Sequence, residues 1–169
     1  MPRAPLRHVL LAAIGVALAS LAPAAAQSPA GSIVPRIVGT WKLNPEKSGA
    51  QVPPDYVEIR QYQLRPDGYM VGLLITGNSR RLRYLQFTAK SDGRDYPEFS
   101  DDIVAEMIAS GKQTPRTYAE RIVDEYVTEW VDKVDGRVTA QGKKIVSKDD
   151  KTLTITVDGQ TQTRIYDRQ

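Results

Sequence analysis

Cysteine is absent from this 169-residue chain, and its only histidine is His8. Without cysteine the chain forms no disulfide and offers no thiol nucleophile or thiolate metal ligand. His8 lies in an N-terminal stretch with the pattern of a leader, so the rest has no imidazole for a Ser-His-Asp arrangement, a zinc site or a haem ligand. We therefore expect no metal, no cofactor and no catalytic residues. An enzyme would be limited to carboxylate, Tyr, Lys or Ser chemistry.

Long apolar segments are also scarce, and the clearest one lies at the N-terminus. Arg3 and Arg7 precede an apolar run that ends near Leu21, and small residues follow as far as Ala26. The run is shorter than the ~20 residues that a membrane-spanning helix needs, and this order of features is typical of a secretory signal peptide. We expect residues 1–26 to be cleaved after Ala26, which predicts a periplasmic or secreted protein with no integral membrane segment in the mature chain.

An excess of basic charge is missing once the leader is set aside. The whole chain has 23 basic and 20 acidic residues, of which Arg3 and Arg7 belong to the leader. The mature chain then has 21 basic residues against 20 acidic ones, a net charge of +1. A nucleic-acid binder needs a basic surface to neutralise phosphates, so we expect no nucleic-acid partner.

The mature chain alternates short β-type segments with turn residues. The expected strands are 37–44, 56–64, 69–76, 81–89, 117–123, 126–134, 137–146, 152–157 and 160–168. Asp-Gly pairs between several of them favour tight hairpins. Because short strands at near-regular spacing are typical of a closed meander, we expect a mostly β, antiparallel up-and-down barrel over 37–169, after a flexible lead-in at 27–36.

One segment has a helical pattern. Ser100 is a suitable N-cap, Asp101 and Asp102 occupy the first turn, and Gly111 follows the last periodic residue. Apolar residues at 103, 104, 107 and 108 form one stripe. We expect one short α-helix here. It would either cover the outer face of the segment 69–76, which is apolar on both faces, or form a lid over the barrel mouth.

The first structured residues carry a family resemblance. Gly39–Leu43 reads Gly-Thr-Trp-Lys-Leu, which resembles the opening motif of the calycins, meaning lipocalins and intracellular fatty-acid-binding proteins. The longer Trp-x-Leu-Asn-x-x-Lys-Ser pattern is similar to exported bacterial lipocalin-like proteins. The resemblance implies a lipocalin-like barrel, in which Gly39 admits the backbone and Trp41 plugs one end with its ring.

The last two segments allow a prediction of side-chain direction. If residues 158–159 form a two-residue turn, Arg164 lies opposite Leu153 and shares its face with Tyr166. Both polar side chains then point into an apolar barrel. A charge in that position needs a partner.

Two roles for this arginine stay open. The motif Thr-Arg-x-Tyr resembles the last strand of intracellular fatty-acid-binding proteins, in which these residues hold a ligand carboxylate, and this implies that Arg164 and Tyr166 bind an acid headgroup. In lipocalins an arginine near the last strand packs across the opening tryptophan, so Arg164 over Trp41 would close the barrel instead. An interior Glu120 or Asp132 is a further candidate partner.

The function follows from whether the barrel is hollow. Tyr126 and Trp130 share a strand face and are candidates to line a cavity. We expect an exported protein that binds a small apolar or fatty-acid-like ligand, including a carboxylate, in the barrel interior. The alternative is a filled barrel that acts as an envelope structural or protein-interaction module. A cavity of roughly a few hundred cubic ångströms with one mouth favours the first.

Overall fold

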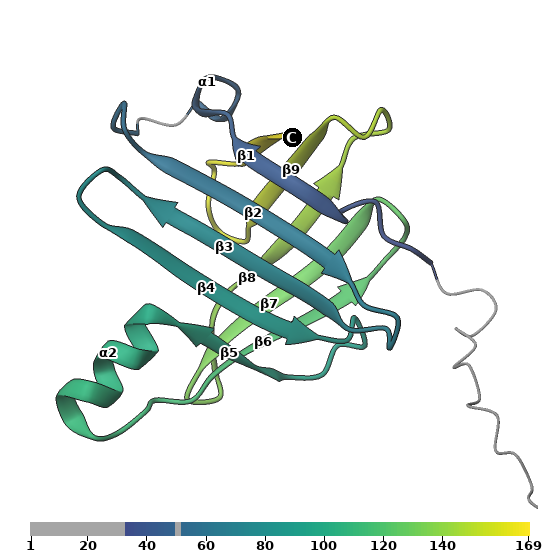
Figure 1. Ribbon diagram of the computed structural model, residues 1–169. Helices are drawn as coiled ribbons and strands as arrows, with labels where there is room; N and C mark the ends of the chain where they lie inside the picture. Colours follow the sequence, from purple (N-terminus) through teal and green to yellow (C-terminus); the bar gives the residue numbers. More distant parts are fainter. Residues whose placement is uncertain (1–32, 50–51) are drawn as a thin grey trace, which may run out of the picture.

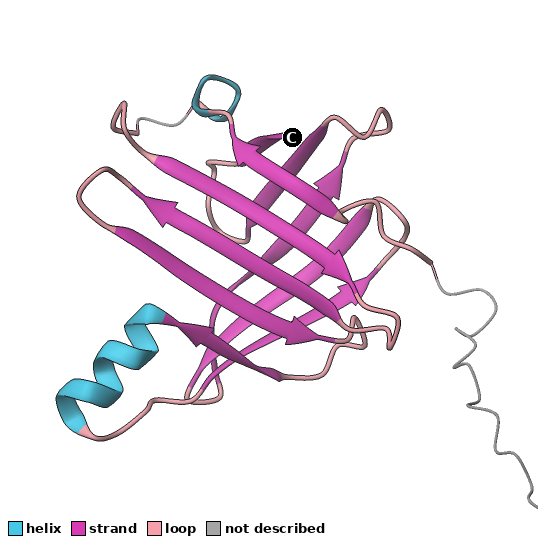
Figure 2. Ribbon diagram, viewed as in Figure 1, coloured by secondary structure: helices cyan, strands magenta, loops and turns pink. Residues whose placement is uncertain are grey.

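Ten strands close into one antiparallel barrel in the computed structural model, which describes residues 33–49 and 52–169 (Figures 1 and 2). The strands are β1 (Gly39–Leu43), β2 (Val57–Leu64), β3 (Met70–Gly77), β4 (Leu82–Ala89), β5 (Tyr96–Ser100), β6 (Arg116–Ile122), β7 (Val127–Val134), β8 (Arg137–Val146), β9 (Thr152–Val157) and β10 (Arg164–Arg168). Each strand pairs with the next along the chain, and β1 pairs with β10 to close the sheet. The predicted mostly β, up-and-down barrel is confirmed. The predicted signal peptide lies outside the described residues.

The structure adds a helix and a strand that the sequence analysis did not expect. α1 (Pro45–Ser48) follows β1, with Asn44 Oδ1 accepting a hydrogen bond from the Lys47 N–H at 2.9 Å and proline at its first position. β5 is joined to β6 only through Tyr96 and Pro97. Because proline has no N–H for a ladder, this segment resembles a turn in the sequence.

The predicted helix is confirmed as α2 (Asp101–Ser110). Ser100 Oγ accepts a hydrogen bond from the Ile103 N–H at 3.3 Å, and Gly111 ends the helix in the left-handed region at φ 69°. The helix contacts β4 and β5, where Asp102 pairs with Arg83 at 3.5 Å, and it projects from one end of the barrel (Figure 1). The expectation that it covers the outer face of β3 is therefore wrong.

The two ends of the barrel differ in how they are filled. We call the end where β1 begins and β10 finishes the base, and the opposite end, where β9 turns into β10, the mouth. Large side chains fill the base half, and the fully buried ones include Trp41, Met70, Leu153 and Tyr166. Over the part of the chain that the structure describes, no helix combines the length and the apolar character needed to cross a bilayer.

Candidate functional site

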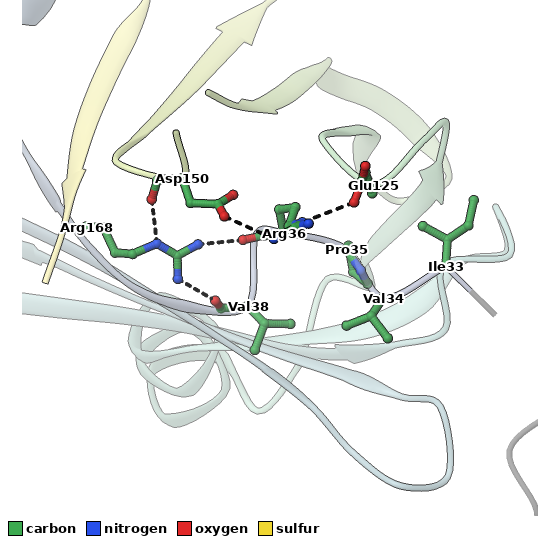
Figure 3. A pocket seen from close by; sticks show the side chains of 8 residues that line it. All are labelled: Ile33, Val34, Pro35, Arg36, Val38, Glu125, Asp150 and Arg168. Atoms are coloured by element: carbon green, nitrogen blue, oxygen red, sulfur yellow. Dashed lines mark hydrogen bonds and ion pairs between the residues drawn. The ribbon is translucent and has the colours of Figure 1, made fainter. Parts of the chain in front are cut away.

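The base of the barrel is closed by Arg168, not by Arg164. Trp41 and Arg168 are direct partners in the β1–β10 ladder, so they share a face, and the guanidinium carbon lies 4.2 Å from the centre of the indole ring. Arg168 also donates to three backbone carbonyls, those of Arg36, Val38 and Asp150, at 2.7–2.9 Å (Figure 3). The prediction that Arg164 packs over Trp41 is wrong, because the strand register places a different arginine opposite the tryptophan.

Gly39 fits this closure by its lack of a side chain. Its φ is +138°, and a Cβ at this position would lie 2.7 Å from Arg168 Nη1. Arg36, the last residue of the predicted lead-in, forms ion pairs of 3.1 Å with both Glu125 and Asp150 (Figure 3). The chain is thus tied to the base before β1 begins.

The polar partner of Arg164 is Glu58, a residue that the sequence analysis did not single out. Glu58 has no exposed side-chain surface. Its carboxylate accepts hydrogen bonds from Arg60 Nη2 at 2.9 Å, from the Tyr166 hydroxyl at 2.6 Å and from the Tyr56 hydroxyl at 3.0 Å, and it forms an ion pair with Arg164. Strict alternation along β2 was a usable signal, because it places residues 58 and 60 on one face.

Electrostatics keep Glu58 ionised despite its burial. Burial alone raises the pKa of this carboxyl, but Arg60, the Tyr166 hydroxyl and Arg164 together outweigh it, so the pKa lies below the usual value. Two guanidinium groups therefore share one carboxylate. The cluster therefore has one excess positive charge. This charge lies at the mouth, because the Arg164 side chain is 52% exposed there.

The final hairpin reaches this geometry through a register that differs from the predicted one. Arg164 pairs with Ile155, and Tyr166 pairs with Leu153. The turn at 158–159 forms, with the Gln160 N–H donating to the Val157 carbonyl at 3.0 Å, but β10 begins only at Arg164. A shift of two residues keeps each side chain on its predicted face, since strand alternation has a period of two.

A cavity of about 350 Å³ lies above the filled base and reaches the mouth. The exposed residues Gln160, Gln162 and Arg164 line it at the mouth. The other lining residues are mostly apolar or aromatic, with three polar members: Leu73, Leu74, Leu85, Ala140, Ile155, Val157, Tyr62, Phe87, Tyr118, Trp130, Arg60, Asp132 and Lys144. This volume is near the lower end of the roughly 300–1,000 Å³ range of small-molecule pockets.

The cavity floor holds a buried lysine. The Lys144 side chain is 3% exposed and its Nζ lies 3.3 Å from Glu120 Oε2. Glu120 also accepts hydrogen bonds from the Tyr118 hydroxyl at 2.8 Å and from Ser91 Oγ at 2.7 Å. The predicted candidate Glu120 is thus the partner of a lysine and not of Arg164.

Two carboxyl groups lie on the strands that flank β6, Glu98 on β5 and Asp132 on β7. Glu98 pairs with the inward-facing Phe87, and Asp132 lines the cavity. Burial raises the pKa of Glu98 to about 7; the nearby Asp132 acts in the same direction and Arg116 opposes it. Burial likewise raises the pKa of Asp132 above its usual value. Asp132, the second predicted partner of Arg164, thus lies on β7 near Glu98 and not beside β10.

The structure separates the predicted ligand-binding residues. Arg164 and Trp130 line the cavity, whereas Tyr166 is fully buried in the Glu58 cluster. Tyr126 lies outside the cavity, with Lys148 Nζ 3.6 Å from its ring centre. Tyr126 does not line the cavity because it precedes β7 at the base end of the barrel, where the Asp124 carboxylate accepts its N–H at 2.7 Å in a turn.

No metal site emerges from the residues that the structure describes, since no three acidic side chains gather there in a way that could hold an ion. Comparison with known proteins finds no family model that matches the chain and no curated protein that matches its sequence.

Proposed function

We propose that this protein is an exported carrier that binds a small apolar ligand bearing a carboxylate in the barrel lumen. The observation that carries the proposal is the cavity of about 350 Å³, which is closed at the base and lined mainly by apolar side chains. A barrel with a purely structural role has no need to leave such a space unfilled, because native interiors pack closely.

The charge distribution orients the ligand. Arg60 and Arg164 share the single carboxylate of Glu58, and the half-exposed Arg164 contacts it through Nη1 alone. A guanidinium has five N–H donors, so Arg164 retains donors for a second carboxylate at the mouth. The apolar tail of the ligand would then extend inward between Leu85 and Trp130.

The cavity volume limits the size of the ligand. At about 30 Å³ for each water-sized group, 350 Å³ corresponds to roughly a dozen such groups. Trp41 and Met70 fill the base half, so a long chain cannot extend further down. We therefore expect an acid with about ten carbons to bind more tightly than one with sixteen.

Isothermal titration calorimetry with decanoate, decanol and hexadecanoate tests this proposal. In Arg164→Gln we expect about tenfold weaker decanoate binding, equivalent to ~1.4 kcal/mol, with decanol binding unchanged. Arg121→Gln is the matched control, because Arg121 is exposed and pairs with Glu129 instead. Ala140→Trp, which places an indole in the lumen, should abolish binding of all three. Absence of binding at millimolar concentration, or binding that Ala140→Trp leaves intact, refutes the proposal.

Export is tested separately. The leader pattern at residues 1–26 supports it. Protein recovered from the periplasm or medium of its host should begin at Gln27, and an intact Met1 in the cytoplasm would contradict export.

A second function is favoured by one observation on the outside of the barrel. Tyr84 and Phe99 are 45% and 48% exposed, with ring centres 6.2 Å apart. Such a pair suits a protein-interaction module. A photo-crosslinking residue at position 84 should then capture one defined partner in the host, and Phe99→Ser should abolish capture. An unchanged pattern of adducts in Phe99→Ser excludes this function.

A further inference from the structure

The cavity floor holds a primary amine, Lys144 Nζ, that is surrounded by aromatic rings. An ion pair with Glu120 alone would not require a lysine in such a buried position. Lys144 is the one buried lysine of the chain; the others, all in described segments, are exposed or half-buried. It lines the cavity, and its Nζ lies 4.7–5.1 Å from the ring centres of Tyr62, Phe87 and Tyr118. A charge in such surroundings is costly to bury even when it is paired.

The neighbours of this amine are suited to proton transfer. The Tyr118 hydroxyl is in hydrogen-bond contact with Lys144 Nζ, and Glu120 Oε2 lies 3.3 Å away. The same Oε2 accepts the Tyr118 hydroxyl at 2.8 Å, so the three groups are directly connected. A carboxylate beside a lysine amine can accept a proton from the ammonium and return it.

We propose that Lys144 binds an apolar aldehyde covalently, as a protonated imine at the cavity floor; this rests on the proposed lumenal binding site. The ammonium passes a proton to Glu120, and the nitrogen lone pair forms a bond to the carbonyl carbon. As the C–N bond forms, the carbonyl π bond breaks and its oxygen takes a proton from the nitrogen, which gives a neutral carbinolamine. Glu120 then returns its proton to the hydroxyl, the C–O bond breaks, water leaves, and the nitrogen lone pair forms the C=N bond. Aldehyde and ammonium thus become iminium and water, with no oxidant or reductant.

Charge conservation is the reason for choosing a carbonyl over a second carboxylate. The iminium has the same single positive charge as the ammonium, so Glu120 remains its counter-ion in the buried site. An anionic headgroup at Lys144 would instead compete with Glu120 for one ammonium. An aldehyde of about ten carbons also fits the cavity volume.

Trapping with a reducing agent tests the proposal on the full mature chain. The protein is incubated with one equivalent of decanal and sodium cyanoborohydride, and the site of decylation is found by peptide mapping. We expect Lys144 to be modified at least tenfold more than any other lysine. Lys144→Arg should remove this adduct. Lys143→Arg should retain it, because Lys143 is the exposed neighbour on the outer face.

Glu120→Gln provides a readout that does not depend on replacing the lysine. With a conjugated aldehyde, the wild-type adduct should show the long-wavelength absorption of a protonated imine at neutral pH. In Glu120→Gln the iminium has no carboxylate counter-ion, so it should lose its proton, and the band should disappear, at a lower pH than in wild type. An unshifted titration of the band, or decylation spread evenly over the surface lysines, overturns the proposal.

Failure of the covalent proposal can be distinguished from failure of the proposed carrier function. If calorimetry shows decanoate and decanol binding but decanal does not modify Lys144, the covalent proposal is wrong and the carrier proposal stands. If none of the three binds, both are wrong.

Discussion

Glu58→Gln tests the centre of the structure, the buried carboxylate held by two guanidinium groups. The substitution keeps the side-chain size but removes the charge that neutralises Arg60, which lies 2.9 Å away. The glutamine amide also places N–H donors where Tyr56 or Arg164 now donates. Breaking a buried ion pair costs about 3–5 kcal/mol. At roughly 2–4 °C for each kcal/mol in a domain of this size, the melting temperature should fall by about 6–20 °C.

The pH dependence provides an independent check of the same prediction. The pKa of Glu58 in the folded protein is lowered from an ordinary value of 4.5. Its ionised form therefore stabilises the fold fully above about pH 4.5, and this contribution is lost as the pH falls through the lower folded-state pKa. The stability difference between wild type and Glu58→Gln should be constant above pH 5 and should shrink in acid.

Urea denaturation followed by tryptophan fluorescence, at several pH values, measures both effects. Glu129→Gln is the control, because Glu129 pairs with Arg121 near the solvent at 2.6 Å and its loss should cost less than about 1 kcal/mol. If Glu58→Gln lies within about 1 kcal/mol of wild type, or if their difference does not shrink in acid, the described cluster does not hold this carboxylate ionised.

Three further substitutions probe the base, the mouth and the barrel wall. Arg168→Ala should lower the unfolding free energy by about 2–4 kcal/mol, since it removes the contact with Trp41 and leaves three carbonyls without their donor. Arg168→Lys should recover only part of this stability in urea denaturation, and full recovery would contradict the closure geometry. Glu98, with its pKa raised to about 7, favours the fold when protonated, so stability should decline from pH 4.5 to 7 and then level off. Glu98→Gln should flatten that decline in urea midpoints measured from pH 5 to 8. An unchanged dependence of the midpoint on pH would contradict the raised pKa of Glu98. Gly72→Ala would place a Cβ 2.2 Å from the Phe87 ring and should lower the unfolding free energy by about 1–3 kcal/mol, measured by calorimetry. Adding Phe87→Leu should restore part of this stability. A neutral effect of Gly72→Ala would show that the ring lies elsewhere.

Local patterns predicted most of the elements. β8 and β9 begin and end at the expected residues, and α2 begins after Ser100 and ends before Gly111. These segments have strong local signals, namely alternation, Asp-Gly turns and helix caps. β5 was not predicted because Pro97 interrupts any strand pattern in its sequence. In the structure only Tyr96 and Pro97 pair with β6.

The candidate site was predicted only in part. Arg164 was placed on the correct face, since a two-residue change of register preserves alternation, and Trp130 does line the cavity. Glu58 and Lys144 were not identified as site residues. Alternation along β2 relates Glu58 to Arg60, but Arg164 and Tyr166 lie on the last strand, and nothing in the sequence places that strand beside Glu58. Lys144 on β8 likewise meets Tyr118 and Glu120 on β6 only through the fold.

By itself, the sequence determined a β-rich chain with turns and caps at defined positions, and it excluded cysteine chemistry throughout and histidine chemistry after residue 8. Those properties depend on neighbours within a few residues. Only the tertiary structure decided which arginine meets Trp41 and which carboxylate meets Arg164. The register between the first and last strands is fixed when the barrel closes, and that closure depends on packing across the whole sheet.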